Sequence, residues 1–297
     1  MKYRYLLYAV LVWWGATSLT RFCMKQTGQL QLSLIRSTRP YDPLFDTRPL
    51  TADEEKEKNE ALGQTYTYFG CGGQAYVFFS EDGKYVIKFF KQHHFNPPTH
   101  LNYIPGISKY RERKFAKRRL NLEQDYLSYK MGFEELPHET ELVYLHLNPT
   151  SHIKKELTLI DRLNIVHKID LDTTDFLIQR RAEAVLPTLK TKLKAGDQEG
   201  AKETINQLLS LVMTRCKKGF GDADPNLITN CGIYKDHAIK IDIGRFSRSP
   251  HMHEPLFYKP ELYRITRPFR KWLVHNAPEL VEHLDSSILE VINDTNS

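Results

Sequence analysis

The segment from Gly219 to Gly244 constrains the fold of this chain more than any other. It reads Gly219-Phe-Gly-Asp222-Ala-Asp-Pro-Asn226-Leu-Ile, and it closes downstream with Ile239-Lys-Ile-Asp242-Ile-Gly244. Mg²⁺ prefers oxygen ligands and keeps several waters, so one carboxylate and one amide oxygen can hold it against a nucleotide. The other carboxylate is then available to orient a hydroxyl for in-line attack. The pattern predicts a phosphate-and-metal site; the competing interpretation is a polar surface turn followed by a buried strand.

Apolar residues on both sides of this segment predict its local structure. Residues 226–228 and 238–241 are expected to form two short strands of a β-hairpin. The turns between them would involve Asn230-Cys-Gly and Tyr234-Lys-Asp-His. Such a hairpin would bring Asn226 and Asp242 together at one end.

A glycine-rich turn lies between apolar runs much earlier in the chain. Residues 68–90 predict a strand, a glycine turn, a strand, a second turn and a third strand. The glycines let the backbone approach phosphates and direct its N–H groups toward them. Lys88 lies between apolar neighbours on the third strand, from which its long side chain can reach under the turn.

Together these two segments resemble the protein-kinase-like superfamily, including its small-molecule branch of aminoglycoside and choline kinases. The resemblance covers roughly residues 65 to 250. It implies an α+β, two-lobed fold with an antiparallel N-terminal sheet, an accompanying helix and a small, mainly helical C-terminal lobe. It also implies ATP-dependent phosphoryl transfer, with ATP and Mg²⁺ as cofactors.

The resemblance implies a nucleotide site in which each matching residue has a role. The glycine-rich loop would consist of Gly70, Gly72, Ala75 and Val77. Lys88 would hold the phosphates, and Glu123, on the helix expected over residues 109–131, would position Lys88. The alternative is that Glu123 pairs with a neighbouring arginine of its own helix. The strand end and connection around Gln179 and Arg181 would be the hinge that contacts adenine.

The resemblance also implies the catalytic roles. Asp222 would be the catalytic-loop aspartate, Asn226 the metal-binding asparagine and Asp242 the aspartate of the D-F-G triplet. The chain departs from the family at four points: Ala75 replaces the third glycine, Phe220 replaces the histidine, Asn226 follows Asp222 by four residues, and no A-P-E segment follows Gly244. The short loop leaves Asn230 as a second metal candidate.

These departures leave an alternative function open. A pseudokinase would keep the fold as a nucleotide-binding or protein-interaction module. A third possibility is a membrane-tethered adaptor that acts through the basic helix over residues 109–131. Because aromatic residues are not interleaved with that basic stretch, nucleic acid is not expected as a partner. A net charge of +6 is compatible with anionic partners and requires none.

The first 25 residues have a basic start and an apolar run from Leu6 to Leu19 that contains Trp13 and Trp14. That run is shorter than the roughly 18–20 residues of a comfortable membrane span. With its aromatic flanks it can just cross a bilayer, so an uncleaved membrane anchor is expected, with orientation unreadable. A cleaved signal for export and a buried helix are the alternatives.

The remaining chain yields further expectations about domains, cysteines, histidines and secondary structure. Residues 26–64 read as a polar linker, followed by a first lobe over 65–178 and a second over 179–297. The four cysteines have neither metal-like nor disulfide-like spacing. His93, His94 and His100 read as a surface loop and not as a metal site. Further strands are expected near residues 141–147, 157–160, 164–171 and 175–179, and helices over 186–195, 201–216 and 259–293.

Overall fold

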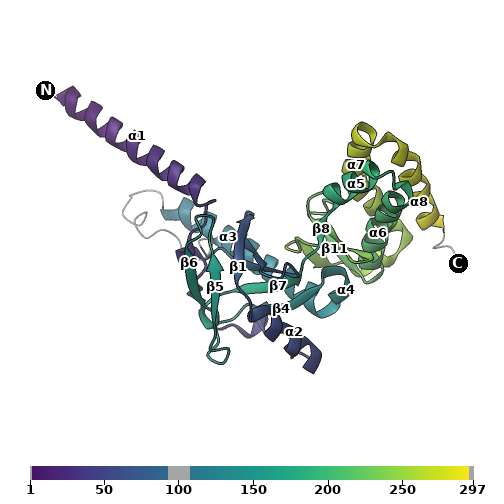
Figure 1. The fold of residues 1–297 in the computed structure, drawn as a ribbon, viewed down its shortest axis with the longest axis horizontal. Helices are drawn as coiled ribbons and strands as arrows, with labels where there is room; N and C mark the ends of the chain where they lie inside the picture. Colours follow the sequence, from purple (N-terminus) through teal and green to yellow (C-terminus); the bar gives the residue numbers. More distant parts are fainter. Residues whose placement is uncertain (1, 93–107, 294–297) are drawn as a thin grey trace. The chain divides into compact units, whose positions relative to one another are not determined.

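The computed structural model describes residues 2–92 and 108–293, which form two compact units (Figure 1). Unit 1 comprises Met1–Pro43, Leu50–Pro105 and His146–Ile178, and unit 2 comprises Leu44–Pro49, Gly106–Leu145 and Gln179–Ser297. His93, His94 and His100 lie outside the described residues.

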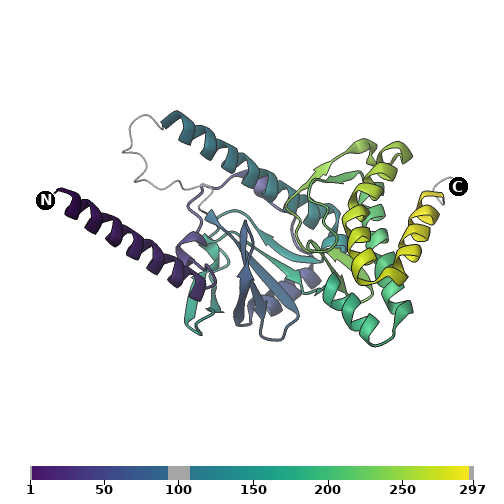
Figure 2. The same ribbon diagram turned by 90° about the horizontal axis from the view of Figure 1, so that it is seen from above.

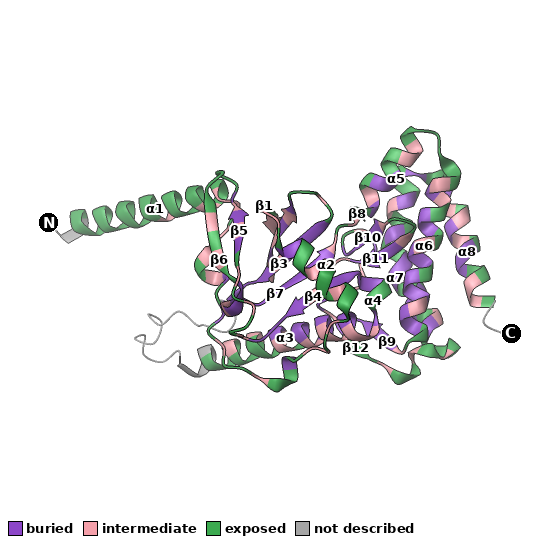
Figure 3. Ribbon diagram, turned by 60° about the horizontal axis from the view of Figure 1, so that its bottom comes forward, coloured by how far each residue is buried: buried purple, intermediate pink, exposed green. Residues whose placement is uncertain are grey.

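A single long helix opens the chain. α1 spans Lys2–Gln26, and its stretch Arg4–Gln26 is long and apolar enough, by length and composition, to cross a membrane. Its apolar side chains are exposed: Trp13 and Trp14 have 69% and 65% of their surface uncovered (Figure 3). A leader sequence would satisfy the same criteria, so anchor and signal remain the two interpretations.

The segment after α1 is packed, contrary to the expectation of a polar linker. α2 spans Ala52–Leu62 and begins with a capping box, in which the side chains of Thr51 and Glu54 each accept the other's backbone N–H. Ile35 and Leu62 are buried within unit 1. The charged run that suggested a linker is instead the solvated face of a capped helix.

The sheet has seven strands. They are β1 (Tyr66–Cys71), β2 (Ala75–Ser80), β3 (Tyr85–Phe90), β4 (Leu142–His146), β5 (Glu156–Ile160), β6 (Val166–Asp170) and β7 (Phe176–Arg180). Their order is β4-β7-β3-β2-β1-β5-β6, and the chain passes from one unit to the other within β4 and within β7. The pairs β1–β2, β2–β3 and β5–β6 are antiparallel, while β1–β5 is parallel. The strands expected over residues 68–90 and 141–179 are confirmed.

Unit 2 is mainly helical. Its helices are α3 (Ser108–Glu135), α4 (Pro137–Thr140), α5 (Val185–Lys194), α6 (Gln198–Lys217), α7 (Pro255–Asn276) and α8 (Val281–Asn293). Its short strands are β8 (Glu183–Ala184), β9 (Phe220–Asp222), β10 (Cys231–Tyr234), β11 (His237–Lys240) and β12 (Phe246–Arg248). The helix expected over residues 201–216 is α6, whose Ile205, Leu208 and Val212 are buried and pack in one core with apolar residues of α7 and α8 (Figure 2). The helix expected over residues 109–131 is α3, in which Leu122 and Tyr126 are buried and Leu120 is exposed.

The hairpin before Asp242 is displaced from its expected position. Its strands are β10 and β11, which pair from Cys231↔Lys240 to Tyr234↔His237, and residues 226–230 form a turn in place of a strand. The Asn226 side-chain oxygen accepts the backbone N–H of Ile228 and Thr229, so local bonds replace a strand ladder there.

The fold class is thus confirmed. A strand–glycine turn–strand–strand segment is followed by a long helix, further strands, a helical part and an Asp-rich loop that leads into a hairpin. This order of elements is the one that the resemblance implies, and the chain has a kinase-like fold.

Candidate functional site

The glycine turn and Lys88 occupy neighbouring positions in the sheet of unit 1. Gly70 is opposite Val77 on β2, and Val77 is opposite Lys88 on β3. The three residues therefore lie side by side across three strands. A Cβ added at Gly70 or Gly72 would meet no atom of the described residues within 4 Å, so the space beside these glycines is open among the described residues. The Gly72 N–H itself donates to the Ala75 carbonyl at 2.9 Å within the turn.

A second lysine, which the sequence reasoning missed, holds the same turn. The Lys91 ammonium donates to the Gly72 carbonyl at 2.6 Å and lies 4.7 Å from the centre of the Tyr76 ring. The Lys91 backbone N–H also donates to the Gln74 carbonyl at 2.8 Å. These bonds restrain the turn from the end of β3. Lys91 lies three residues after Lys88, and the sequence contains no further signal for its role.

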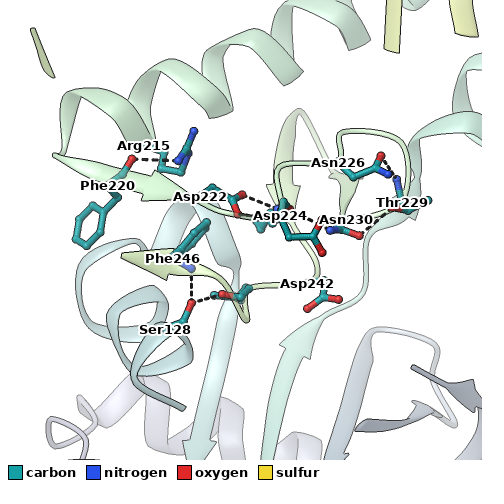
Figure 4. A network of polar contacts seen from close by, with 12 residues as sticks. Ser128, Arg215, Phe220, Asp222, Asp224, Asn226, Thr229, Asn230, Asp242 and Phe246 are labelled. Carbon is teal, nitrogen blue, oxygen red and sulfur yellow. Dashed lines mark hydrogen bonds and ion pairs between the residues drawn. The ribbon is translucent and has the colours of Figure 1, made fainter. Parts of the chain in front are cut away.

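In unit 2 the loop Asp222–Asn230 is hydrogen-bonded to the start of the Asp242 segment (Figure 4). The Asn230 carbonyl accepts the backbone N–H groups of Ile241 at 2.8 Å and of Asp242 at 3.3 Å. The Asn230 N–H in turn donates to the Asn226 carbonyl at 2.9 Å. Asn230 therefore joins the loop to the Asp242 segment within unit 2, and the expected proximity of Asn226 to Asp242 stays a prediction.

Asp222 is buried in an ion pair. Its Oδ2 lies 2.6 Å from Nζ of Lys240, and the two side chains are only 4% and 5% exposed. Lys240 also donates to the Asp224 carbonyl at 2.7 Å. The cavity that Asp222 and Lys240 help to line measures about 20 Å³, room for about one water molecule. In this structure the Asp222 carboxylate is thus engaged with Lys240.

Two arginines hold the backbone on either side of Asp222. Arg215 of α6 donates to the Phe220 carbonyl at 3.0 Å, and Arg264 of α7 donates to the Asp222 carbonyl at 2.8 Å. Both also bind the Glu261 carboxylate. Burial favours the neutral acid, but the Arg264 hydrogen bond and the Arg215 charge hold the pKa of Glu261 below its usual value. The backbone from Phe220 to Asp222 is therefore fixed by a charged network in unit 2.

The Asp242 segment is anchored on α3. The Ser128 hydroxyl donates to the Ile243 carbonyl and accepts the Phe246 N–H at 2.7 Å. The Tyr129 hydroxyl donates to Asp242 Oδ1 at 3.4 Å. Burial and, secondarily, the Asp242 charge raise the pKa of Tyr129 well above its usual value. Tyr129 consequently remains a hydrogen-bond donor toward Asp242.

The two asparagines differ in how their amides are used. The Asn226 side-chain oxygen already accepts two backbone N–H groups, at 2.9 and 3.3 Å. The Asn230 amide nitrogen donates to the Asp224 carbonyl at 3.1 Å, and its side-chain oxygen accepts the Thr229 hydroxyl at 2.9 Å. The side-chain oxygen of Asn230 therefore binds a hydroxyl, whereas the side-chain oxygen of Asn226 binds two backbone N–H groups. Together with Asp242, Asn230 supplies the hard oxygen donors that suit Mg²⁺.

Asp224 is a second carboxylate of this loop, and it was not singled out from the sequence. Its backbone N–H donates to Asp222 Oδ1 at 2.9 Å, and the residue is exposed. In Figure 4 Asp222, Asp224 and Asn230 lie on the same loop, above Asp242 in the view. The available signal was the sequence Asp-Ala-Asp-Pro, which places a second carboxylate two residues after Asp222. Residues two apart in an extended chain lie on the same face, so Asp224 could have been considered beside Asp222.

The other expected site residues occupy defined positions. Glu123 of α3 forms an ion pair with Arg119 at 2.9 Å, and its pairing with Lys88 stays a prediction. Gln179 is buried, and its amide donates to the carbonyls of Thr140 and Lys240 at 2.6 and 2.9 Å. Arg181 is exposed. The Gln179 side chain is therefore hydrogen-bonded within unit 2. A contact with adenine would then use the backbone groups of this segment.

No family model and no curated protein sequence matches the chain. Among solved structures it is similar to the bifunctional kinase-methyltransferase WbdD, with 16% identity and a TM-score of 0.34, over 72% of this chain and 42% of that chain. It is also similar to the ROP18 kinase domain in complex with AMP-PNP and sucrose, with 16% identity and a TM-score of 0.34, over 61% and 51% of the two chains. The Rv3197–erythromycin complex from Mycobacterium tuberculosis matches at 14% identity and a TM-score of 0.32, over 88% and 73%. The chain thus spans about half or less of the length of WbdD and of the ROP18 kinase domain. The description of the fold depends on the order of helices and strands in this chain and not on these weak similarities.

Proposed function

We propose that this chain is an ATP-dependent phosphotransferase with a hydroxyl group as acceptor. The observation that carries the proposal is the pair of backbone hydrogen bonds from Ile241 and Asp242 to the Asn230 carbonyl. These bonds unite an Asp/Asn-rich loop with a carboxylate at the end of a hairpin. Phosphoryl transfer needs little covalent chemistry from the protein, so positioned oxygen ligands and acceptor-facing carboxylates are its main requirement.

In this proposal Asp242 holds Mg²⁺, assisted by an amide oxygen from Asn226 or Asn230. The metal would supply charge neutralisation at the phosphates when bound. The turn at Gly70–Val77 and Lys88 bind the phosphates, with Glu123 positioning Lys88. The acceptor hydroxyl is oriented by a carboxylate of the catalytic loop, either Asp222 or Asp224.

Paired variants test the proposal through the metal dependence of ATP binding. Asp242→Asn is expected to remove the part of ATP affinity that depends on Mg²⁺, because it removes the anionic metal ligand. Lys88→Met is expected to weaken ATP binding both with and without Mg²⁺, because the ammonium contacts the phosphates directly. Calorimetric titration of the full chain with ATP, at saturating Mg²⁺ and with a chelator, measures both effects.

The matched control for this experiment is Lys84→Met. Lys84 is an exposed lysine next to β3, with one weak ion pair to Asp82 at 3.6 Å. The Lys84→Met variant should leave ATP affinity unchanged. If Asp242→Asn binds ATP as tightly as the parent protein at every Mg²⁺ concentration, the metal assignment is wrong. ATP binding that is undetectable in the parent protein would overturn the proposed function itself.

We further propose that α1 anchors the protein in a membrane. The exposed apolar surface of Arg4–Gln26 supports this placement. The full chain is expected to sediment with membranes and to resist alkaline extraction, whereas a chain beginning at Gln26 should be soluble. A mature product that lacks residues 1–25 would identify a cleaved signal. An unprocessed and soluble full chain would exclude both interpretations.

A further inference from the structure

We propose that His138, Glu141 and His237 form a binding site for a zinc-class transition-metal ion in unit 2. One ligand atom from each residue lies within 4.8 Å of the other two. His138 is on α4, Glu141 directly follows α4, and His237 begins β11. Two imidazoles and one carboxylate are a donor set that proteins use for zinc, with the remaining position open.

Glu141 divides its two carboxylate oxygens between different partners. Oε2 forms an ion pair with Arg180, and Oε1 lies 3.0 Å from Nε2 of His237. The residue is buried, and its backbone has the left-handed conformation, with φ = +49°, that ends α4. The Arg180 pair occupies Oε2, and Oε1 is directed at His237.

His237 is oriented from several sides, as a metal-binding imidazole normally is. Its Nε2 faces Glu141, and its Nδ1 lies 3.4 Å from the Asp236 carboxylate. The Tyr234 ring meets the imidazole edge-on at 5.8 Å. Metal-bound histidines usually donate their second ring N–H to a carboxylate, which fixes the tautomer and raises ligand basicity. Asp236 can fill this outer role for His237.

His138 completes the set from the solvent side. Its ring stacks on that of His237, with the ring centres 4.1 Å apart and 22° between the planes. Zinc takes nitrogen and oxygen ligands at about 2.0–2.2 Å. Two ligand atoms bound to one ion are therefore closer together than the three ligand atoms here, which lie within 4.8 Å of one another. His138 is exposed and can rotate to make this adjustment.

The cluster borders a cavity of about 290 Å³ in unit 2. His138, Asp236 and His237 line one side of it, and α6 residues that include Glu203 and Gln207 line another. An ion held by three protein ligands would therefore have its open position near a space that admits water or a small anionic ligand. The site uses imidazole nitrogen, whereas the proposed Mg²⁺ site uses only oxygen donors, so the inference does not depend on the proposed function.

Zinc titration of the full chain tests the inference directly. Equilibrium dialysis against ZnCl₂, with Mg²⁺ present to occupy oxygen-only sites, is expected to give one high-affinity site in the parent protein. His138→Ala and His237→Ala should each weaken that site by at least about 100-fold, since even outer partners contribute about 10–100-fold. Asp236→Asn should weaken it by about 10-fold. Co²⁺ bound in place of zinc should show a visible absorption that His138→Ala abolishes.

Matched controls make the result decisive. His251→Ala removes an exposed histidine whose side chain contacts Glu254 and Phe257, and this variant should retain the full zinc affinity. His138→Ala removes an exposed side chain, so an unchanged melting temperature without metal will show that the variant folds. Zinc binding that survives in both His138→Ala and His237→Ala, or that is absent from the parent protein, would overturn the proposal. A loss of equal size in His251→Ala would do the same.

Discussion

Asp222→Asn is expected to lower the free energy of unfolding of unit 2 by about 3–5 kcal/mol, the usual effect of removing one partner of a buried ion pair. The variant leaves the Lys240 ammonium, whose side chain is 5% exposed, without its counter-charge, while its hydrogen bond to the Asp224 carbonyl is kept. The cost comes from a buried charge that has lost its counter-charge, and not from the lost hydrogen bond itself. The effect should therefore appear in stability even when no nucleotide is present.

Tryptophan fluorescence can assign this change to unit 2. The chain has three tryptophans, of which Trp13 and Trp14 are exposed on α1 and Trp272 packs against the core of unit 2. In a background that carries Trp13→Phe and Trp14→Phe, urea unfolding followed at Trp272 reports on unit 2. Asp224→Asn is the matched control, because exposed substitutions of this kind usually change stability by about 0.5 kcal/mol or less.

A double-mutant cycle shows whether the loss belongs to the ion pair. Asp222→Asn combined with Lys240→Met should be less destabilising than the sum of the single changes, because the second substitution removes the unpaired charge. Additive effects, or an Asp222→Asn variant as stable as the parent protein, would show that the pair does not stabilise unit 2. Asp222 would then be available for the acceptor role that the sequence assigns to it.

The strands around the glycine turn were predictable, because they depend on local periodicity: apolar runs on either side of a glycine turn are typical of paired strands. The pairing of individual residues was not predictable, because the register of β1 and β2 shifts between Tyr68 and Gly70. This irregularity places Gly70 opposite Val77, which in turn is opposite Lys88 on β3. The buried stripe of α6 was predictable from local periodicity, with a helical period.

The partner of Asp222 was not predictable, because it depends on the tertiary structure. Lys240 is 18 residues away and reads as one charged residue of an alternating strand. The error in the hairpin had a different cause. Asn226 belongs to a residue type whose side chain competes for nearby backbone N–H groups, and in the structure it forms such a turn in place of a strand. That competition is a local signal, and the sequence contained it.

Asp224→Asn is expected to reduce turnover by about 10²-fold or more while leaving ATP affinity and stability nearly unchanged. Asp224 is exposed and lies beside the loop residue Asn230, whose amide binds its carbonyl. A carboxylate that meets an acceptor hydroxyl must be accessible, and the amide of asparagine cannot accept its proton. Asp222, in contrast, is occupied by Lys240. Loss of turnover without loss of stability is thus expected for Asp224, and loss of stability for Asp222.

Phosphate release and transfer to a panel of hydroxyl acceptors, measured on the folded full chain at saturating Mg²⁺ and ATP, compare the two aspartates. Glu290→Gln is the control: it makes the same carboxylate-to-amide change on the exposed face of α8 and should keep the parent turnover. Parent-level turnover in Asp224→Asn, together with its loss in a stably folded Asp222→Asn, would return the acceptor role to Asp222. If the parent protein binds Mg²⁺-ATP but transfers phosphate no faster than either variant, the chain is a pseudokinase. The exposed Asp224 would then have no catalytic role.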